Sequence, residues 1–150
     1  MATGPANLIK TQIKSNLLSL VADTVLGAVI EKDINANILK EEITGYPCAI
    51  LGSSSMEAQW EYQQSNRRTY IFPILIVQLQ DNLISNTAIE DLRDAIALKF
   101  DNDVTLSGTA KLGVSAIMSE RQVIADNGKT FVVFSVTIKA STIVDLTYNF

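Results

Sequence analysis

The residues most able to do chemistry are the hydroxyls of a short glycine-containing segment, Gly52-Ser53-Ser54-Ser55. Such a segment could hold a nucleophile or bind a phosphate. It lacks the second glycine of a nucleophile elbow and the Gly-Lys-Ser/Thr ending of a P-loop. The chain also contains no histidine that could act as a base. Because Gly and Ser commonly interrupt regular structure, we expect a solvated loop between two strands.

An acidic triplet, Asp101-Asn102-Asp103, imitates the start of a calcium-binding loop. Leu106 stands where that loop needs its glycine, and Leu112 stands where it needs a bidentate glutamate. The triplet is therefore predicted to end a helix rather than to bind a cation.

Two glutamates and a cysteine complete the candidates for chemistry. Glu57 and Glu61 lie near Trp60 and could suggest a glycosidase pair, but a hydrated strand face is the ordinary explanation. Cys48 follows Pro47 inside an apolar run, so we expect a small buried side chain rather than a reactive thiol. No enzyme class is favoured, and we predict no catalytic, cofactor-binding or metal-binding residues.

The composition excludes several further classes of function. The absence of histidine removes the commonest general base, the commonest metal ligand and any Ser-His-Asp triad. With 12 basic and 16 acidic side chains the net charge is −4, and no block of like charge is present. We therefore expect no specific nucleic-acid binding and no anionic membrane partner. With 150 residues, 47% of them hydrophobic, residues 1–150 are expected to form a single domain.

The distribution of charge and cysteine also predicts a compartment. Lys10 and Lys14 interrupt the apolar residues near the N-terminus, so we expect no signal peptide. No apolar run approaches the length of a membrane span. A single cysteine cannot form an internal disulfide, which favours synthesis and folding in a reducing cytoplasm.

Helical periodicity appears in two places. Pro5 suits a first helical turn, and apolar residues follow it at helical spacing: Ile9, Ile13, Leu17, Leu20 and Val21. Thr87 and Glu90 form a possible capping box for a second helix, whose apolar stripe is Ile89, Leu92, Ile96 and Phe100.

Strand patterns occupy most of the remaining chain. Residues 46–51, 56–63 and 70–80 read as three consecutive strands, and 114–124 and 130–146 as two more. The last two are joined by Asp126-Asn127-Gly128-Lys129, because Asn-Gly favours a tight hairpin. Residues 25–30 could form an edge strand interrupted by Gly27, and residues 37–42 a helical turn. We predict an α+β fold: a mainly antiparallel sheet of about five strands with two principal helices packed on one face.

The 70–80 strand is apolar on both faces, although a sheet with helices on one side should leave its other side wet. Either a loop or the 24–44 segment covers the second face, or a neighbouring subunit does. Pro73 removes a ladder donor and suggests an edge position or a bulge. Arg67 and Arg68, at the expected preceding turn, are either solvated charges or carboxylate-binding residues of a subunit interface.

The arrangement of helices and strands resembles that of the tail terminator (tail completion) proteins of long-tailed bacteriophages. The motifs that carry the resemblance are Tyr46-Pro47 before the first core strand, Asn66-Arg67-Arg68 at the hairpin, and the strand motif Arg68-Thr69-Tyr70-Ile71-Phe72.

The resemblance implies a structural virion protein without catalysis or cofactors. It implies a homo-oligomer, a hexameric ring, at the head-proximal end of the tail. There the ring would bind the tail tube protein, stop tube polymerisation and present the head-tail joining surface to the connector or neck protein. We place the subunit or tube interface, as a hypothesis, at Arg67, Arg68, Trp60, Tyr62 and Tyr70.

Two alternatives stay open. A neck or head-closure connector protein of the same particle would share the interface residues but differ in partner. A cellular ferredoxin-like regulatory domain would need a small-molecule pocket with convergent polar groups. The 52–55 loop is the candidate for such a pocket in the sequence.

Overall fold

A computed structural model of the chain describes residues 4–34, 45–62, 65–79, 86–126 and 128–145. In chain order the elements are α1 (Pro5–Ala22), β1 (Ala28–Glu31), β2 (Cys48–Leu51), β3 (Ser55–Tyr62), β4 (Ser65–Leu79), α2 (Asn86–Asp101), β5 (Gly113–Met118), β6 (Gln122–Asp126) and β7 (Lys129–Asp145). The predicted α+β class is confirmed. The sheet has seven strands rather than about five, and it is mixed because β1 pairs with β2 in parallel.

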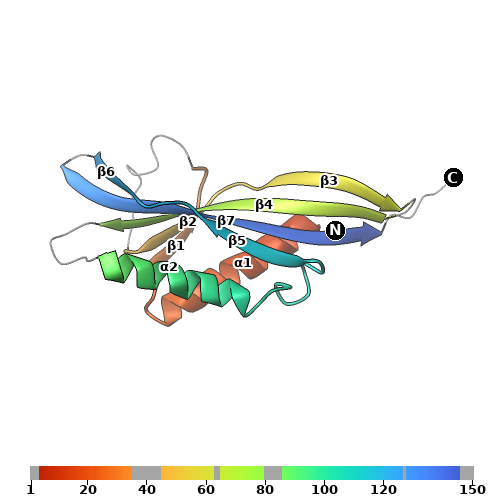
Figure 1. Cartoon of the computed structure of the whole chain (residues 1–150), viewed down its shortest axis with the longest axis horizontal. Helices are drawn as coiled ribbons and strands as arrows, with labels where there is room; N and C mark the ends of the chain where they lie inside the picture. The colour runs from red at the N-terminus through yellow and green to blue at the C-terminus, as the bar shows by residue number, and fades with distance from the viewer. Residues whose placement is uncertain (1–3, 35–44, 63–64, 80–85, 127, 146–150) are drawn as a thin grey trace.

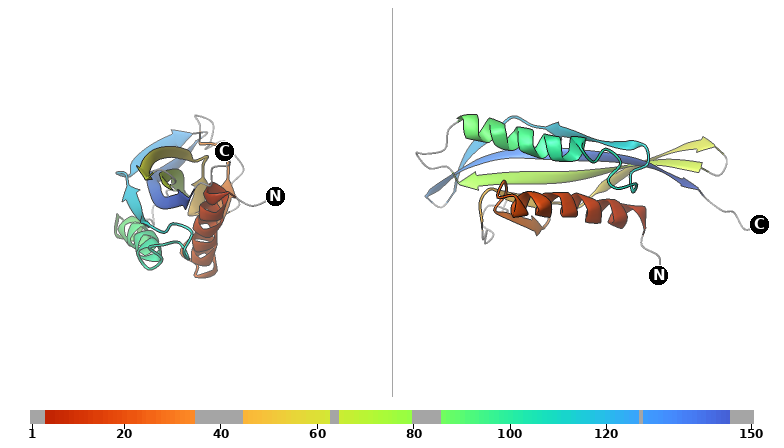
Figure 2. Two further views of the ribbon diagram at one scale, coloured as in Figure 1. Left: turned by 90° about the vertical axis from the view of Figure 1, so that its right-hand side faces the viewer. Right: turned by 90° about the horizontal axis from the view of Figure 1, so that it is seen from below.

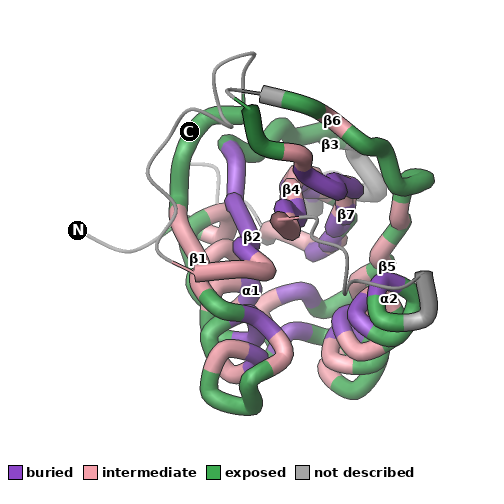
Figure 3. Tube along the Cα trace, turned by 90° about the vertical axis from the view of Figure 1, so that its left-hand side faces the viewer, coloured by how far each residue is buried: buried purple, intermediate pink, exposed green. Residues whose placement is uncertain are grey.

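Two long antiparallel strands, β4 and β7, form the axis of the molecule. Their pairing runs from Ser65 opposite Asp145 to Leu79 opposite Phe131. Each carries two short strands in tandem along its outer edge: β2 and β3 beside β4, and β5 and β6 beside β7. Both helices lie on the same face of this sheet, as predicted (Figures 1 and 2). Seen end-on, β3 and β6 lie on the side of the central pair away from the helices, whereas β1 lies beside α1 and β5 beside α2 (Figure 3).

The helices bury the stripes that their periodicity predicted. Ile9, Ile13 and Leu17 of α1 are fully buried, and Pro5 stands at its start, where a missing amide costs nothing. In α2 the buried positions are Ile89, Leu92, Ile96 and Phe100. This helix begins at Asn86, one residue before the expected cap, and ends at Asp101, as the acidic triplet predicted. None of the helices in the described ranges is long and apolar enough to cross a membrane.

The main core lies between the helices and one face of the β4–β7 pair. Alternate residues of β4 supply Phe72, Ile74 and Ile76, and alternate residues of β7 supply a matching row: Val132, Phe134, Val136, Ile138 and Ala140. The opposite face holds a second, smaller cluster: Cys48, Ile50, Val77, Phe131 and Val133. Cys48, Ile50 and Val77 are 0% exposed within the single chain, so no neighbouring subunit is needed to cover this part of the second face.

The predicted strand 114–124 is wrong as a single element. β5 ends at Met118 opposite Val136, and β6 starts at Gln122 opposite Val133. Residues 119–121 thus face only residues 134–135, so one residue is extra and the strand breaks. Ser119 seals the break: its amide donates to the Ser135 carbonyl at 2.9 Å, and its hydroxyl accepts from the Ser135 amide at 2.9 Å. The β6–β7 turn forms at the predicted place, with Asp126 opposite Lys129 and φ of 76° at Gly128.

The expectation that Pro73 marks an edge or a bulge is also wrong. Pro73 lies in the centre of the sheet, opposite Thr137 of β7. Its carbonyl accepts a hydrogen bond from the Gly52 amide at 2.9 Å, on the edge of β4 that faces away from β7. The nitrogen and carbonyl of one strand residue point to the same edge, so the Pro73 nitrogen also faces away from β7. At that point the outer partner changes from β2 to β3, and the missing donor therefore breaks no pairing with β7.

The predicted edge strand around residues 25–30 is present as β1, which starts after Gly27 instead of running through it. A side chain at residue 27 would lie 2.6 Å from the Tyr46 carbonyl oxygen, so only glycine fits. The helical turn expected at residues 37–42 lies outside the described residues.

Candidate functional site

The β3–β4 hairpin reaches beyond the ends of both helices (Figure 1 and the right view of Figure 2). We call β3 and its paired segment of β4, residues 65–71, the arm. Its register runs from Ser55 opposite Ile71 to Tyr62 opposite Ser65, with an irregularity between Trp60 and Tyr62. The predicted interface residues all lie on the arm. Trp60 and Tyr62 are backbone members of β3, and their side chains lie outside the described part of the structure.

The two arginines do not sit at the turn, which corrects the sequence-based prediction. Arg67 and Arg68 are inside β4, opposite Gln59 and Ala58 of β3. They are also opposite Ile143 and Thr142 of β7. Strand pairing on both edges holds this polar stretch extended, and the β7 partner is too distant in sequence for a local pattern to reveal it. Because successive strand residues point to opposite faces, the two guanidinium groups serve different surfaces.

Arg68 lies on the helix side of the sheet in a largely neutral environment. Its Nε donates to Asn66 Oδ1 at 3.3 Å, and its Nη1 lies 3.5 Å from Tyr70 Oη. Both partners are buried, with Asn66 5% and Tyr70 4% exposed, while Arg68 is half-buried. The ion pairs formed among the described residues do not include Arg68. Tyr70 thus belongs to the chain's own core and serves to position the arginine.

Arg67 lies on the far side of the sheet and is exposed. With Glu57, Ala58 and Thr69 it lines an open hollow of about 380 Å³. Beneath it, the hydroxyls of Thr69 and Ser141 lie 3.0 Å apart. The described residues of the arm therefore present a polar far face, and on its helix-side face they include the half-buried cation Arg68.

The segments first considered for chemistry have structural roles. The 52–55 segment is a loop whose last residue begins β3, and Ser53 bonds to Asp33. Next to it, Lys10 and Lys14 hold Glu31 at 3.1 and 2.9 Å. These two lysines lower the pKa of the Glu31 carboxyl. The small hollow here has a volume of about 160 Å³.

The other two candidates are also explained by packing. Burial raises the pKa of the Cys48 thiol to about 11, as expected for an inert buried cysteine. Burial alone would raise the pKa of Asp103, but hydrogen bonds from Asn16, the Ser107 amide and Gln12 outweigh it and lower the pKa. Among the described residues, no three His, Cys, Asp or Glu side chains gather where they could hold a metal ion.

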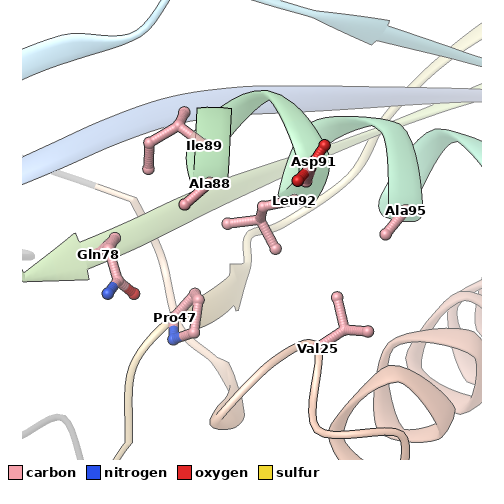
Figure 4. Close-up of a pocket in the computed structure, with 8 residues that line it drawn as sticks. All are labelled: Val25, Pro47, Gln78, Ala88, Ile89, Asp91, Leu92 and Ala95. Atoms are coloured by element: carbon pink, nitrogen blue, oxygen red, sulfur yellow. The ribbon is translucent and has the colours of Figure 1, made fainter. Parts of the chain in front are cut away.

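Another cavity, of about 390 Å³, lies between the start of α2 and the end of β4 (Figure 4), at the end of the molecule opposite the arm (Figure 1). We call it the groove. Val25, Pro47, Ala88 and Leu92 supply apolar walls, and Asp91 stands on the same helix as the last two. Gln78 of β4 extends into it, and within the described structure its Oε1 is buried without a hydrogen-bond partner.

Sequence reasoning missed the groove, although one signal for it was present. From Tyr70 onward, the β4 residues that share the helix-side face are Tyr70, Phe72, Ile74, Ile76 and Gln78. Gln78 is the amide that ends an otherwise aromatic and aliphatic row. An amide side chain that faces the helices is expected to be buried, and a buried amide needs a hydrogen-bond partner.

No family model matches the chain, and no curated protein matches it in sequence.

Proposed function

We propose that this protein is a structural virion component that forms a ring on the end of a phage tail tube. In this role the ring stops polymerisation of the tube protein and offers a joining surface to the connector or neck protein. Two things support the proposal: the resemblance of the Tyr46-Pro47, Asn66-Arg67-Arg68 and Arg68–Phe72 motifs to tail terminators, and the arm's chemistry. No step of this function needs a catalytic group.

The observation that carries the proposal is the state of Arg68. A guanidinium removed from water costs free energy unless a carboxylate or several hydrogen bonds compensate it. Among the described residues, Arg68 makes two long contacts, both to neutral oxygens, and takes part in no ion pair. On a hairpin that projects from the body, such an arginine is suited to a carboxylate of another chain, which its planar fork can bind at two points.

The charge distribution supports a passive role toward a genome that passes through such a ring. The net charge is −4, and each phosphate contact would add affinity that slows the passage of DNA. We expect no measurable duplex binding at physiological salt in an anisotropy titration. Micromolar binding that weakens with added salt would count against the tail role.

The test of the function is the double variant R67E/R68E, expressed in place of the wild type in cells that assemble the particle. We expect a folded protein, checked by far-UV circular dichroism and thermal melting. Because the variant cannot close the ring, tails should grow beyond their normal length in electron micrographs, and the infectious titre should fall.

A matched control is K111E/K129E, which changes the net charge by the same amount at two exposed lysines outside the arm. This control should give tails of normal length. Tails of normal length and a normal titre from R67E/R68E would contradict the proposed role of the arm.

A further inference from the structure

The groove combines apolar walls with two acceptors that lack partners in the described chain. Gln78 Oε1 is buried and unsatisfied, and the exposed carboxylate of Asp91 belongs to no ion pair. Asp94, one turn further along α2, is exposed and likewise takes part in no ion pair of the described residues. An occupant must therefore bring hydrogen-bond donors and positive charge, together with apolar surface.

An arginine side chain has this combination of properties. Its aliphatic stem packs on apolar walls, while its guanidinium carries five N–H donors and no acceptor. A lysine would supply charge but not the flat fork that can reach an amide oxygen and a carboxylate together. The groove is thus complementary to an arginine presented on a neighbouring surface.

The chain presents such an arginine at its other end. Arg68 lacks a carboxylate, and Asp91 lacks a cation, among the ion pairs of the described residues. The arm and the groove lie at opposite ends of the long axis (Figures 1 and 4), so one molecule cannot bring the two together. Two copies can do so, and because the surfaces differ, each copy keeps one free surface for the next. Repetition of such a head-to-tail contact gives a ring where the rotation between copies closes, and an open helical filament where it does not.

We propose that the arm of one copy docks on the groove of the next, with Arg68 placed against Asp91 and Gln78 of its neighbour. This contact names the two surfaces that would meet in the proposed ring. It rests on the proposed function in one respect, namely that copies of the chain associate with one another. The occupant is a second copy, because its charge and donors match what the groove lacks.

The experiment is a charge exchange followed by analytical ultracentrifugation over a wide concentration range. R68E should set a carboxylate against Asp91, and D91R should set two guanidinium groups against each other. Each single variant should raise the dissociation constant of self-association about 30-fold or more. The double variant R68E/D91R restores opposite charges but sets a carboxylate against Gln78 Oε1, so it should associate more tightly than either single variant and more weakly than the wild type.

Mixing the two single variants gives a sharper outcome. The arm of R68E carries a carboxylate that matches the groove of D91R, and the unchanged arm of D91R matches the unchanged groove of R68E. Two proteins that fail to associate alone should therefore associate when mixed, by alternation. Asp91 is exposed on α2, so D91R should melt like the wild type and tests the contact without a folding defect. The control pair K111E and E120R alters exposed residues of the same signs and should change no dissociation constant.

A third variant, Q78L, should affect folding and association in opposite directions. Removing an unsatisfied buried acceptor should leave the melting temperature of the monomer unchanged or higher. Association should weaken, because the arginine loses an acceptor. Unchanged association of Q78L would overturn the contact between Arg68 and Gln78.

The proposal is overturned if the wild type stays monomeric at every concentration, or if neither R68E/D91R nor the mixture associates better than the single variants. Failure of the proposed function gives a different result. If charge exchange restores association but the assembled protein does not control tail length, the contact between arm and groove is supported and the proposed tail function is contradicted. If R68E and D91R both control tail length normally, the docking falls.

Discussion

The two ends of the β4–β7 pair use the same strands in different ways. On the helix side, buried aromatic and aliphatic residues continue along the pair from Tyr70 to Ile76. On the far side, the end flanked by β2 and β6 holds a buried cluster that includes Ile50 and Val77. The end flanked by β3 and β5 shows polar groups there, among them Thr69. We call these the apolar end and the arm end.

The difference teaches how stability and interaction are divided in this molecule. The apolar end buries side chains on both faces and therefore contributes most to folding. The arm end buries one face only, and its far face stays hydrated. Polar contacts join the helices that cover the pair: Asp103, just after α2, accepts from Gln12 and Asn16 of α1 at 3.1 and 3.0 Å. Because the far face of the arm end is hydrated, substitutions of its surface residues should reduce the stability of the fold only slightly.

The largest effect should come from the apolar end. Ile50→Ala removes a fully buried side chain from the second cluster, and the free energy of unfolding should fall by about 2–5 kcal/mol. Urea denaturation followed by circular dichroism measures the loss. A loss below about 1 kcal/mol would mean that this cluster contributes little and that the two ends do not differ as described.

Alkaline pH should also weaken the apolar end. The Cys48 thiol has its pKa raised from 9.0 to about 11, so the unfolded chain releases its proton first as the pH rises. The free energy of unfolding should fall through this range by about 1.4 kcal/mol per pH unit at most. Cys48→Ala should remove this part of the pH dependence. Equal slopes for wild type and variant above pH 9 would contradict the burial of the thiol.

Acid should act on the helix layer through Asp103, which joins the end of α2 to α1. Its pKa lies below 3.8, so its contribution is present at neutral pH and is lost as the pH falls through the lower folded value. Asp103→Ala should reduce the free energy of unfolding by about 1–2 kcal/mol at pH 7. The gap between wild type and variant should narrow as the pH falls through the lowered pKa of Asp103, since the wild type then loses its carboxylate as well. A gap that persists in acid would assign the effect to packing instead.

The smallest effect should come from the far face of the arm. Thr69→Ala removes a hydroxyl contact to Ser141 from a hydrated surface, and stability should change by less than about 0.5 kcal/mol. The measurement is the same urea denaturation used for Ile50→Ala. A loss comparable with that of Ile50→Ala would abolish the distinction between the two ends.

Local periodicity determined much of this protein. The spacing of apolar residues specified both helices, alternation specified β7, and a continuous apolar run specified the part of β4 from residue 70 onward. Asn127-Gly128 specified the place of the β6–β7 turn, and each of these signals depends on residues close in sequence. The apolar surroundings of Cys48 likewise predicted its burial. The two-sided apolar character of residues 70–80 was visible as well, although its cover was not.

Only the tertiary structure decided which strands lie beside one another. Pairing with β7 placed Arg67 and Arg68 inside a strand instead of a turn, and the tandem of β2 and β3 made Pro73 acceptable at the centre of the sheet. The groove likewise requires Gln78, Pro47 and α2 to meet, although they are far apart in the chain. A sequence pattern records the period of an element, whereas its partners follow from long-range packing that many residues determine together.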